Sequence, residues 1–310
     1  MGEMVHTPSG REPEQRRTVV ITGGSSGLGL AAAEVLARAG DEVVLLGRHP
    51  GRLRRAADRV SQASGRPTPS YRADFAVLDE VRAVAGLIAV DHPVIHVLVN
   101  NAGLLAPLSL PWSARRSRRT VDGLDRTMQV NHLAGFLLTH LLRPALRAAA
   151  ATADGPARVI TTASLAEMWG WLDVDRPGAP LARNVSRWLA YGSSKQANVL
   201  FTAEAARRWA ADGIVPTCFF PGLVQTRFGR GSLLFTLARP LPIVFSPPEL
   251  GAGTLVWLAT ADDALVPGGY FAYRSPFAAS PRGTDPDRAR RLWQASLAAV
   301  GLADEAPVVR

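Results

Sequence analysis

The stretch Thr18-Val19-Val20-Ile21-Thr22-Gly23-Gly24-Ser25-Ser26-Gly27-Leu28-Gly29 decides the fold. It reads as a short β-branched strand, a glycine-rich turn and the start of an Ala-rich helix that ends near Gly40. A strand, a glycine turn and a helix in this order open a doubly wound α/β fold. The glycines let the backbone approach a pyrophosphate, and the helix N-terminus supplies N–H groups. The stretch therefore predicts a nucleotide site at this turn.

Strands and helices alternate along the rest of the chain, which predicts a parallel sheet covered by helices. Further strands are expected at 42–46, 69–73, 94–99, 158–162 and 214–220. A long helix is expected at 120–151. The fold class is thus α/β, a single-domain Rossmann fold with a doubly wound parallel sheet and helices on both faces. Residues 1–17, rich in Gly, Pro, Glu and Arg, are expected to form a disordered tail.

The overall charge of the chain is strongly basic, with a formal net charge of +9 over 310 residues and a pI near 10.9. Such a charge raises nucleic acids or acidic membranes as partners. The Arg residues are scattered, however, and their densest run, Arg115 to Arg119, has no nucleic-acid motif around it. We therefore expect a solvated loop there and no nucleic-acid partner.

The single cysteine and the hydropathy pattern both point to the cytoplasm. Cys218 lies in an apolar run and can form no intrachain disulfide, which fits a reducing compartment and a core position. The first 17 residues are polar and lack the apolar region of a signal peptide. No apolar run approaches the ~20 residues of a membrane-spanning helix. We expect no membrane span.

The residues after the second expected strand indicate which nicotinamide cofactor the chain binds. Enzymes that bind NAD usually have an acidic residue near this point for the ribose hydroxyls, whereas an Arg accommodates the 2′-phosphate of NADP. Here no acid follows the strand, and Arg48, Arg52, Arg54 and Arg55 do. The alternative is an Arg-rich helix surface in an Arg-rich chain. The pattern favours NADP(H) over NAD(H).

A tyrosine and a lysine stand four residues apart at Tyr191 and Lys195, in a run with helical spacing that continues to Arg208. Residues at this separation share one face of a helix. A positive charge stabilises a phenolate, and a free phenol titrates near pH ~10, too high for proton transfer at neutral pH. Lys195 is the single lysine of the chain, and every other strong cation is Arg. The pair predicts acid–base chemistry, although this spacing also occurs by chance.

Several motifs in order along the chain, covering roughly residues 18–300, resemble the short-chain dehydrogenase/reductase family. They are the loop Thr22 to Gly29, Asn100 to Gly103, Asn131, Ser164 with Tyr191 and Lys195, and Pro221 to Thr226. Within the family, residues 130–142, 164–166 and 289–294 look most like the retinol dehydrogenase and WW-domain oxidoreductase branch. The resemblance implies a domain over 18–300, a substrate lid at about 226–248 and a C-terminal tail at 301–310.

The same resemblance implies a catalytic role for each of four residues. Tyr191 would donate a proton to a carbonyl oxygen as hydride arrives from NADPH, or accept one in reverse. Lys195 would lower the pKa of Tyr191 and bond the nicotinamide ribose. Ser164 would bind the substrate oxygen, and Asn131 would hold a water that links Lys195 to solvent. Asn131 could instead cap or kink its helix, and Ser164 could end a strand.

The cofactor contacts implied by the family lie in six segments, and we expect no metal. The phosphates would contact Gly23, Ser25, Ser26, Gly27 and Leu28, with Arg48 at the 2′-phosphate. The adenosine would contact Asp74, Phe75, Asn100 and Ala102. The nicotinamide half would contact Tyr191, Lys195, Pro221, Val224 and Thr226.

The expected function is an NADP(H)-dependent oxidoreductase that interconverts a carbonyl and its alcohol. Apolar segments at 104–108, 168–172 and 233–245 flank the expected pocket and suggest a small hydrophobic substrate, although ordinary core and lid packing explains them as well. We expect no counterpart of the membrane-anchoring segment of many retinol dehydrogenases in this chain. The alternative is an NADP-binding sensor or scaffold without catalysis. The family suggests a homodimer or homotetramer.

Overall fold

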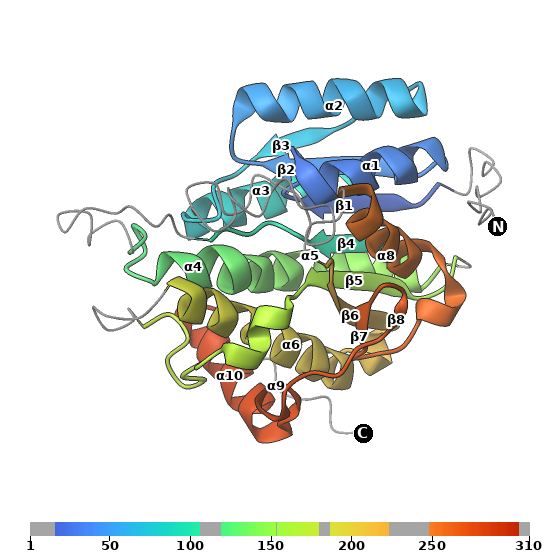
Figure 1. Cartoon of the computed structure of the whole chain (residues 1–310). Helices are drawn as coiled ribbons and strands as arrows, with labels where there is room; N and C mark the ends of the chain where they lie inside the picture. Colours follow the sequence, from blue (N-terminus) through green and yellow to red (C-terminus); the bar gives the residue numbers. More distant parts are fainter. Residues whose placement is uncertain (1–15, 106–118, 153, 180–186, 223–247, 304–310) are drawn as a thin grey trace, which may run out of the picture.

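A computed structural model of the chain describes residues 16–105, 119–152, 154–179, 187–222 and 248–303 (Figure 1). The strands are β1 Thr18–Thr22, β2 Glu42–Gly47, β3 Ser70–Arg72, β4 Val97–Asn100, β5 Ala157–Thr162, β6 Ile214–Phe220, β7 Tyr270–Ala272 and β8 Ser275–Pro276. The α-helices are α1 Gly27–Arg38, α2 Pro50–Ser64, α3 Leu78–Asp91, α4 Arg126–Met128, α5 Ala134–Ala150, α6 Arg187–Arg208, α8 Pro248–Thr260, α9 Pro281–Thr284 and α10 Pro286–Ala299. Shorter turns are η3 Gln129–Leu133, η4 Leu165–Trp169, η5 Ala210–Asp212 and η6 Asp262–Ala264.

The eight strands form one sheet in the order β3-β2-β1-β4-β5-β6-β7-β8. All neighbouring strands pair in parallel except β7 and β8, which are antiparallel. The strand order reverses between β1 and β4. In open sheets of this kind ligands bind beyond the carboxyl ends of the strands at such a reversal, so this edge positions the site.

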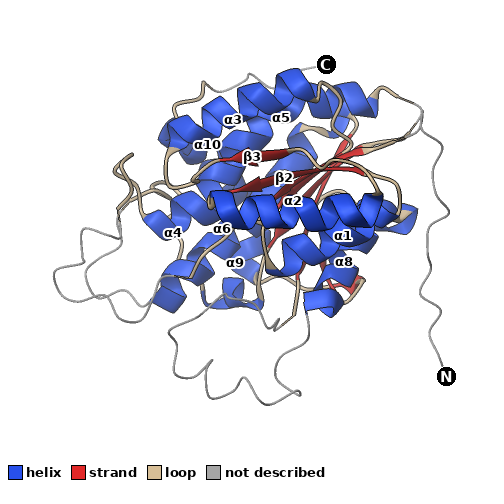
Figure 2. Ribbon diagram, turned by 90° about the horizontal axis from the view of Figure 1, so that it is seen from above, coloured by secondary structure: helices blue, strands red, loops and turns tan. Residues whose placement is uncertain are grey.

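Helices cover both faces of the sheet because successive strand residues point to opposite sides. Val20 of β1 packs into a core built with α3, α5, α6 and α10, whereas Val19 and Ile21 pack into a second core built with α1, α2 and α8. The two groups of helices lie on either side of the strands in Figures 1 and 2. This confirms the predicted doubly wound α/β fold.

Most strands lie where the sequence predicted them, and the long helix expected at 120–151 begins later, at Arg126, and ends at Ala150. Asp125 caps a helix that begins at Arg126, because its carboxylate accepts a hydrogen bond from Met128 N at 2.9 Å. The helix then passes through the π turn η3 before α5. The short strands β7 and β8 were not predicted. Cys218 is fully buried, as expected of a core cysteine.

Arg17, which the sequence analysis placed in the N-terminal tail, is buried at the start of β1. Its Nη2 lies 2.9 Å from a carboxylate oxygen of Asp41, and its Nη1 donates to the Ala259 carbonyl at 2.7 Å. Arg17 thus ties β1 to the segment before β2 and to the last turn of α8, where a cation favours the helix dipole.

Across the described ranges, no helix combines the length and the apolar character that crossing a membrane would require.

We predict that Asp41→Ala lowers the free energy of unfolding by about 3–5 kcal/mol, because it leaves the buried Arg17 charge without its partner. Arg38→Ala is the matched control, since Arg38 is exposed and lies 3.8 Å from Glu34; its loss should cost less than about 1 kcal/mol. Urea denaturation measures both. Equal small losses in the two variants would contradict the prediction.

Candidate active site

The turn between β1 and α1 has the shape of a phosphate site. Gly23 and Gly27 adopt left-handed conformations with φ of +67° and +58°, which side chains rarely adopt. Ser26 is the N-cap of α1, and within the described part of the chain its side chain makes no capping hydrogen bond. The first N–H groups of α1 can therefore bind an anion, as expected for Gly23 to Leu28.

The Thr22 hydroxyl joins this turn to the loop that follows β4. It donates to the Val99 carbonyl at 3.0 Å and accepts from the N–H groups of Asn101 and Ala102 at 2.9 and 3.0 Å. The Asn101 amide also donates to the Thr22 carbonyl at 2.9 Å. The sequence analysis assigned no role to these two side chains. The signal was present, since both follow buried strand residues directly.

Arg48 lies beside the phosphate turn. A Cβ on Gly47 would come within 3.2 Å of the Ser25 side chain, so the end of β2 approaches the turn. Arg48 is exposed there, with Nε donating to His49 Nε2 at 3.1 Å. Residues 47–52 contain no acid. This position suits recognition of a phosphate on the adenosine ribose.

The residues predicted to contact the adenosine differ in whether their side chains are turned into the protein. The Asp74 carboxylate accepts from Ala76 N at 3.0 Å at the turn before α3. The side chains of Phe75 and Asn100 are turned inward: Phe75 is buried, and Asn100 donates to the Thr139 hydroxyl of α5 at 2.8 Å. Any cofactor contact of these two residues therefore falls to their backbone. Ala102 lies against Gly23.

The predicted nicotinamide contacts are described in part. Pro221 follows β6 and is half-buried. Val224, Thr226 and nearly all of the expected lid lie outside the described residues, as does most of the basic run before Arg119.

Ser164 and Tyr191 come together at the carboxyl end of β5, joined by a side-chain hydrogen bond. Ser164 is the N-cap of η4, and its Oγ also accepts from Ala166 N at 3.2 Å. Lys195, one turn beyond Tyr191 on α6, places Nζ 5.6 Å from the phenol ring centroid and donates to the Thr162 carbonyl at 2.8 Å. The structure thus gathers three of the four predicted catalytic residues around the end of one strand.

Asn131 completes the group from the π turn η3. Its Oδ1 accepts from Leu104 N at 2.7 Å, and its Nδ2 donates to the Leu104 carbonyl at 3.0 Å and to Ser194 Oγ at 2.9 Å. A Cβ on Gly103 would lie 3.4 Å from Asn131 Oδ1 and 3.8 Å from Lys195 Nζ. Both amide hydrogens of Asn131 are used by protein atoms, so a water at this residue would have to donate to one of its carbonyl oxygens.

A close backbone contact fixes the Ser164 turn against α6. A Cβ on Gly170 would lie 2.7 Å from the Gly192 carbonyl oxygen, and a Cβ on Gly192 would lie 2.5 Å from the Ala166 carbonyl oxygen. Since real contacts of this kind do not occur, both positions require glycine as the backbone stands. The Trp171 N–H also donates to the Ser193 hydroxyl at 3.0 Å. Main-chain contact between the segment after Ser164 and helix α6 therefore fixes the distance between Ser164 and Tyr191.

Burial controls the ionisation of the catalytic pair. It raises the pKa of Tyr191 above the usual value for a phenol, and the hydrogen bond from Ser164 only partly opposes this. Burial also lowers the pKa of Lys195 to about 7, so the amine is partly neutral at pH 7. Lys195 is not among the groups that shift the pKa of Tyr191 in the protein alone, so its role in lowering that pKa stays a prediction.

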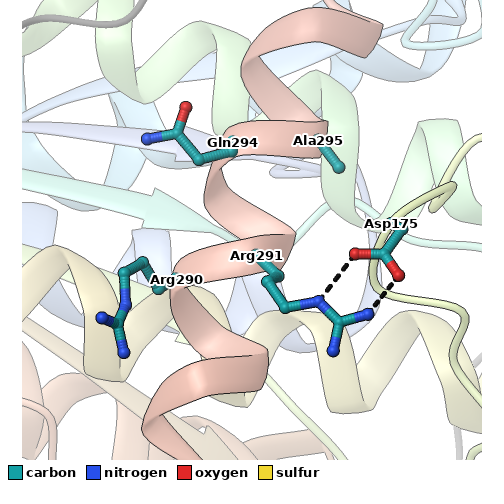
Figure 3. A pocket seen from close by; sticks show the side chains of 5 residues that line it. All are labelled: Asp175, Arg290, Arg291, Gln294 and Ala295. Carbon is teal, nitrogen blue, oxygen red and sulfur yellow. Dashed lines mark hydrogen bonds and ion pairs between the residues drawn. The ribbon is translucent and has the colours of Figure 1, made fainter.

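A separate hollow of about 350 Å³ lies on α10 (Figure 3). Its lining residues are Asp175, Arg290, Arg291, Gln294 and Ala295. The Arg291 Nε donates to Asp175 at 2.8 Å. None of the predicted site residues lines this hollow.

Comparisons with known proteins agree with this geometry. A family model described as short chain dehydrogenase matches residues 17–175. A protein of Streptomyces sp. strain C5, provisionally named daunorubicin C-13 ketoreductase DnrU, is 43% identical over 95% of this chain and 96% of its own. Human retinol dehydrogenase 13 is 34% identical over 95% of this chain and 87% of its own.

Solved structures show the same similarity. A protein of unassigned function from Mycobacterium paratuberculosis has a TM-score of 0.73 at 29% identity, over 96% of both chains. A short chain dehydrogenase of Escherichia coli CFT073, solved with NADPH, has a TM-score of 0.63 at 25% identity, over 84% of this chain and 97% of its own. With a family model over residues 17–175 and relatives 34–43% identical over nearly its whole length, the chain belongs to the short chain dehydrogenase family and is an oxidoreductase of its retinol dehydrogenase-like branch.

Proposed function

We propose that this protein is an NADPH-dependent reductase of a hydrophobic ketone or aldehyde. The observation that carries the proposal is the buried Tyr191 phenol, which interacts with the half-buried Ser164 hydroxyl and has the Lys195 Nζ 5.6 Å from its ring centroid. NADPH, when bound, supplies the hydride, which adds to the carbonyl carbon. The carbonyl π electrons would move to the substrate oxygen, and this oxygen would take the Tyr191 proton. The products would be the alcohol and NADP⁺.

The ionisation of Tyr191 supports the reducing direction. Its raised pKa keeps the phenol protonated at neutral pH, in the form that donates a proton. The Ser164 hydroxyl bonds to the phenol and can share the substrate oxygen as negative charge develops. Lys195, with a pKa near 7, can pass protons to Tyr191 at neutral pH. Asn131, which braces the loop after β4 against α6, would hold a water that links Lys195 to solvent.

The residues present fit NADP(H). The uncapped start of α1 with Gly23, Ser25, Ser26, Gly27 and Leu28 would hold the phosphates, because backbone N–H groups and the helix dipole favour an anion. Arg48 would bind the 2′-phosphate, and the absence of an acid at residues 47–52 disfavours NAD(H). Asp74, Ala102 and the Phe75 and Asn100 backbone would contact the adenosine. Pro221, Val224 and Thr226 would contact the nicotinamide.

An apolar substrate is supported by side chains beside Tyr191. Trp188, one turn earlier on α6, packs in a T-shaped arrangement with the phenol ring, with centroids 6.5 Å apart, and it is 38% exposed. Met168 and Trp169 of η4, the turn that Ser164 begins, are also exposed. Large exposed apolar side chains next to a reactive group indicate a binding surface. The ketoreductase and retinol dehydrogenase names of relatives agree with a hydrophobic carbonyl or alcohol.

The compartment and assembly follow from weaker observations. The buried free thiol of Cys218 suits a reducing compartment, and we propose the cytoplasm. A homodimer or homotetramer is our expectation from the family, and sedimentation of the purified chain tests it.

The deciding experiment incubates the protein with NADPH and a panel of aliphatic, aromatic and polycyclic carbonyls, and follows loss of cofactor absorbance. Turnover of apolar members supports the proposal. Tight NADPH binding without turnover of any carbonyl or alcohol would instead favour a sensor or scaffold.

Tyr191→Phe should lower kcat for reduction by about 100-fold or more, because it removes the proton donor. The dissociation constant of NADPH should stay within about threefold, since Phe fills the same space. Stopped-flow turnover and fluorescence titration measure the two quantities. Tyr71→Phe, on the distant strand β3, is the control. Unchanged turnover in Tyr191→Phe would contradict the assignment of Tyr191 as the proton donor.

Arg48→Ala should weaken NADPH binding by about 10- to 100-fold, the loss expected for a hydrogen bond to a charged group. NADH binding should change little, because NADH lacks the 2′-phosphate. Isothermal titration of both cofactors gives the ratio. Arg38→Ala, at the opposite end of α1, should leave it unchanged. A wild type that binds both cofactors equally would refute NADP preference.

The two directions of reaction should respond differently to pH. Alcohol oxidation needs the Tyr191 phenolate as proton acceptor, so its kcat should rise from pH 7 to 10 as the raised pKa is approached. Reduction uses the protonated phenol and should not rise over the same interval. Initial rates in both directions, with saturating cofactor, provide the test. A parallel increase in reduction would contradict the assignment of Tyr191 as the acid.

A further inference from the structure

The carbonyl oxygen of Thr162, at the end of β5, is shared by two donors from α6. Lys195 Nζ lies 2.8 Å from it and Asn198 Nδ2 lies 3.0 Å from it. Both side chains are buried, with 3% and 2% of their surface exposed. A carbonyl with two lone pairs can accept both bonds. The positive end of the Asn198 amide nevertheless shares this oxygen with the ammonium, which disfavours the charged form of Lys195.

His132 determines which way the Asn198 amide points. Its Nδ1 lies 3.3 Å from Asn198 Oδ1, and its Nε2 lies 3.1 Å from the hydroxyl of Ser296 on α10. Because Asn198 Nδ2 donates to Thr162, Oδ1 is the acceptor, and His132 Nδ1 must carry the hydrogen. The Nε2 atom of the neutral ring then accepts from Ser296. Burial lowers the pKa of His132 to about 4, so this neutral form persists at pH 7.

Few groups around Lys195 can influence the charge of its amine. Burial alone lowers the pKa of its amine. On its own helix the titratable neighbour is Tyr191, and from η3 it is His132, which acts through Asn198. Thr162 of β5 and Gly103 of the loop after β4, which approach Nζ, carry no charge. Within the described part of the chain no charged group shifts the pKa of Lys195, and the Asn198 amide is the polar side chain that shares its acceptor.

We propose that His132 is a positioning residue, which locks the Asn198 amide and thereby sets how strongly the Thr162 carbonyl holds the Lys195 ammonium. Without His132 the amide can turn over and present its oxygen to Nζ, which would favour the ammonium. The hydrogen-bonded chain from Ser296 to Lys195 joins α10, η3, α6 and β5. The functional importance of Lys195 rests on the proposed function, but the charge on Lys195 can be measured without it.

Lys195 is the single lysine of the chain, so its ionisation is directly observable. A tag-free protein labelled with ¹³C at lysine Cε gives one side-chain signal, and its chemical shift against pH reports the pKa of Lys195. His132→Phe removes both hydrogen bonds and retains a ring against Phe136 and Phe201, whose centroids lie 5.9 and 6.2 Å away. We expect it to raise the pKa of Lys195 by about one unit or more.

Three further variants separate positioning from packing. His132→Gln keeps a donor and an acceptor and should restore the wild-type value. Ser296→Ala removes the outer bond and should raise the pKa of Lys195 by less than His132→Phe does. His140→Phe is the matched control: its ring stacks on the same Phe136 at 4.2 Å and its pKa is also lowered to about 4, but its Nδ1 contacts the Phe136 carbonyl. It should leave Lys195 unchanged.

A Lys195 pKa that is unmoved in His132→Phe would overturn the inference, as would equal shifts in His132→Phe and His140→Phe. Should His132→Phe fail to fold, an unshifted Ser296→Ala would overturn it as well. The titration needs neither cofactor nor substrate. If no carbonyl is turned over, the proposed function fails while the His132 result stands separately.

Discussion

The hydroxyl of Thr22 is the point on which the nucleotide half of the site depends. It donates to the Val99 carbonyl near the end of β4 and accepts from two successive N–H groups of the next loop, at 2.9–3.0 Å. In this way it closes the sheet where the strand order reverses. The Asn101 amide then fills the space against Gly29, where a Cβ would come within 2.6 Å of it. The glycine turn is thus shaped by Thr22 at the end of β1 and by Asn101 in the loop after β4.

The sequence predicts a strand well where it is long, buried and rich in branched residues. β1 and β6 were expected with the bounds that the structure gives them. β7 and β8 were missed because each has three residues or fewer and because the turn between them lacks the usual signal. Tyr273 and Arg274 adopt positive φ there, where hairpins generally have Asn or Gly. The sheet edge, not local propensity, imposes this turn.

In the catalytic site, too, contacts between residues close in sequence could be predicted, whereas contacts between distant residues could not. Tyr191 and Lys195 lie one turn apart on one helix, so their spacing alone brought them together in the prediction. The partners of Lys195 could not be predicted, because Thr162 is 33 residues away and the tertiary packing of β5 on α6 decides which carbonyl is offered. Burial could not be read either, and it raises the pKa of Tyr191. The resemblance supplied the residues, and the structure supplied their environment.

The crossing of Gly170 and Gly192 has a consequence for how this site can vary. Two main chains already in contact cannot be brought closer by any exchange of side chains, whereas every residue other than glycine would force them apart. The separation of Ser164 from Tyr191 is therefore at its lower bound. Mutation can only widen this part of the catalytic site, so a descendant that accepts a different carbonyl would more readily change at Trp188 and its exposed neighbours than along the line between serine and tyrosine.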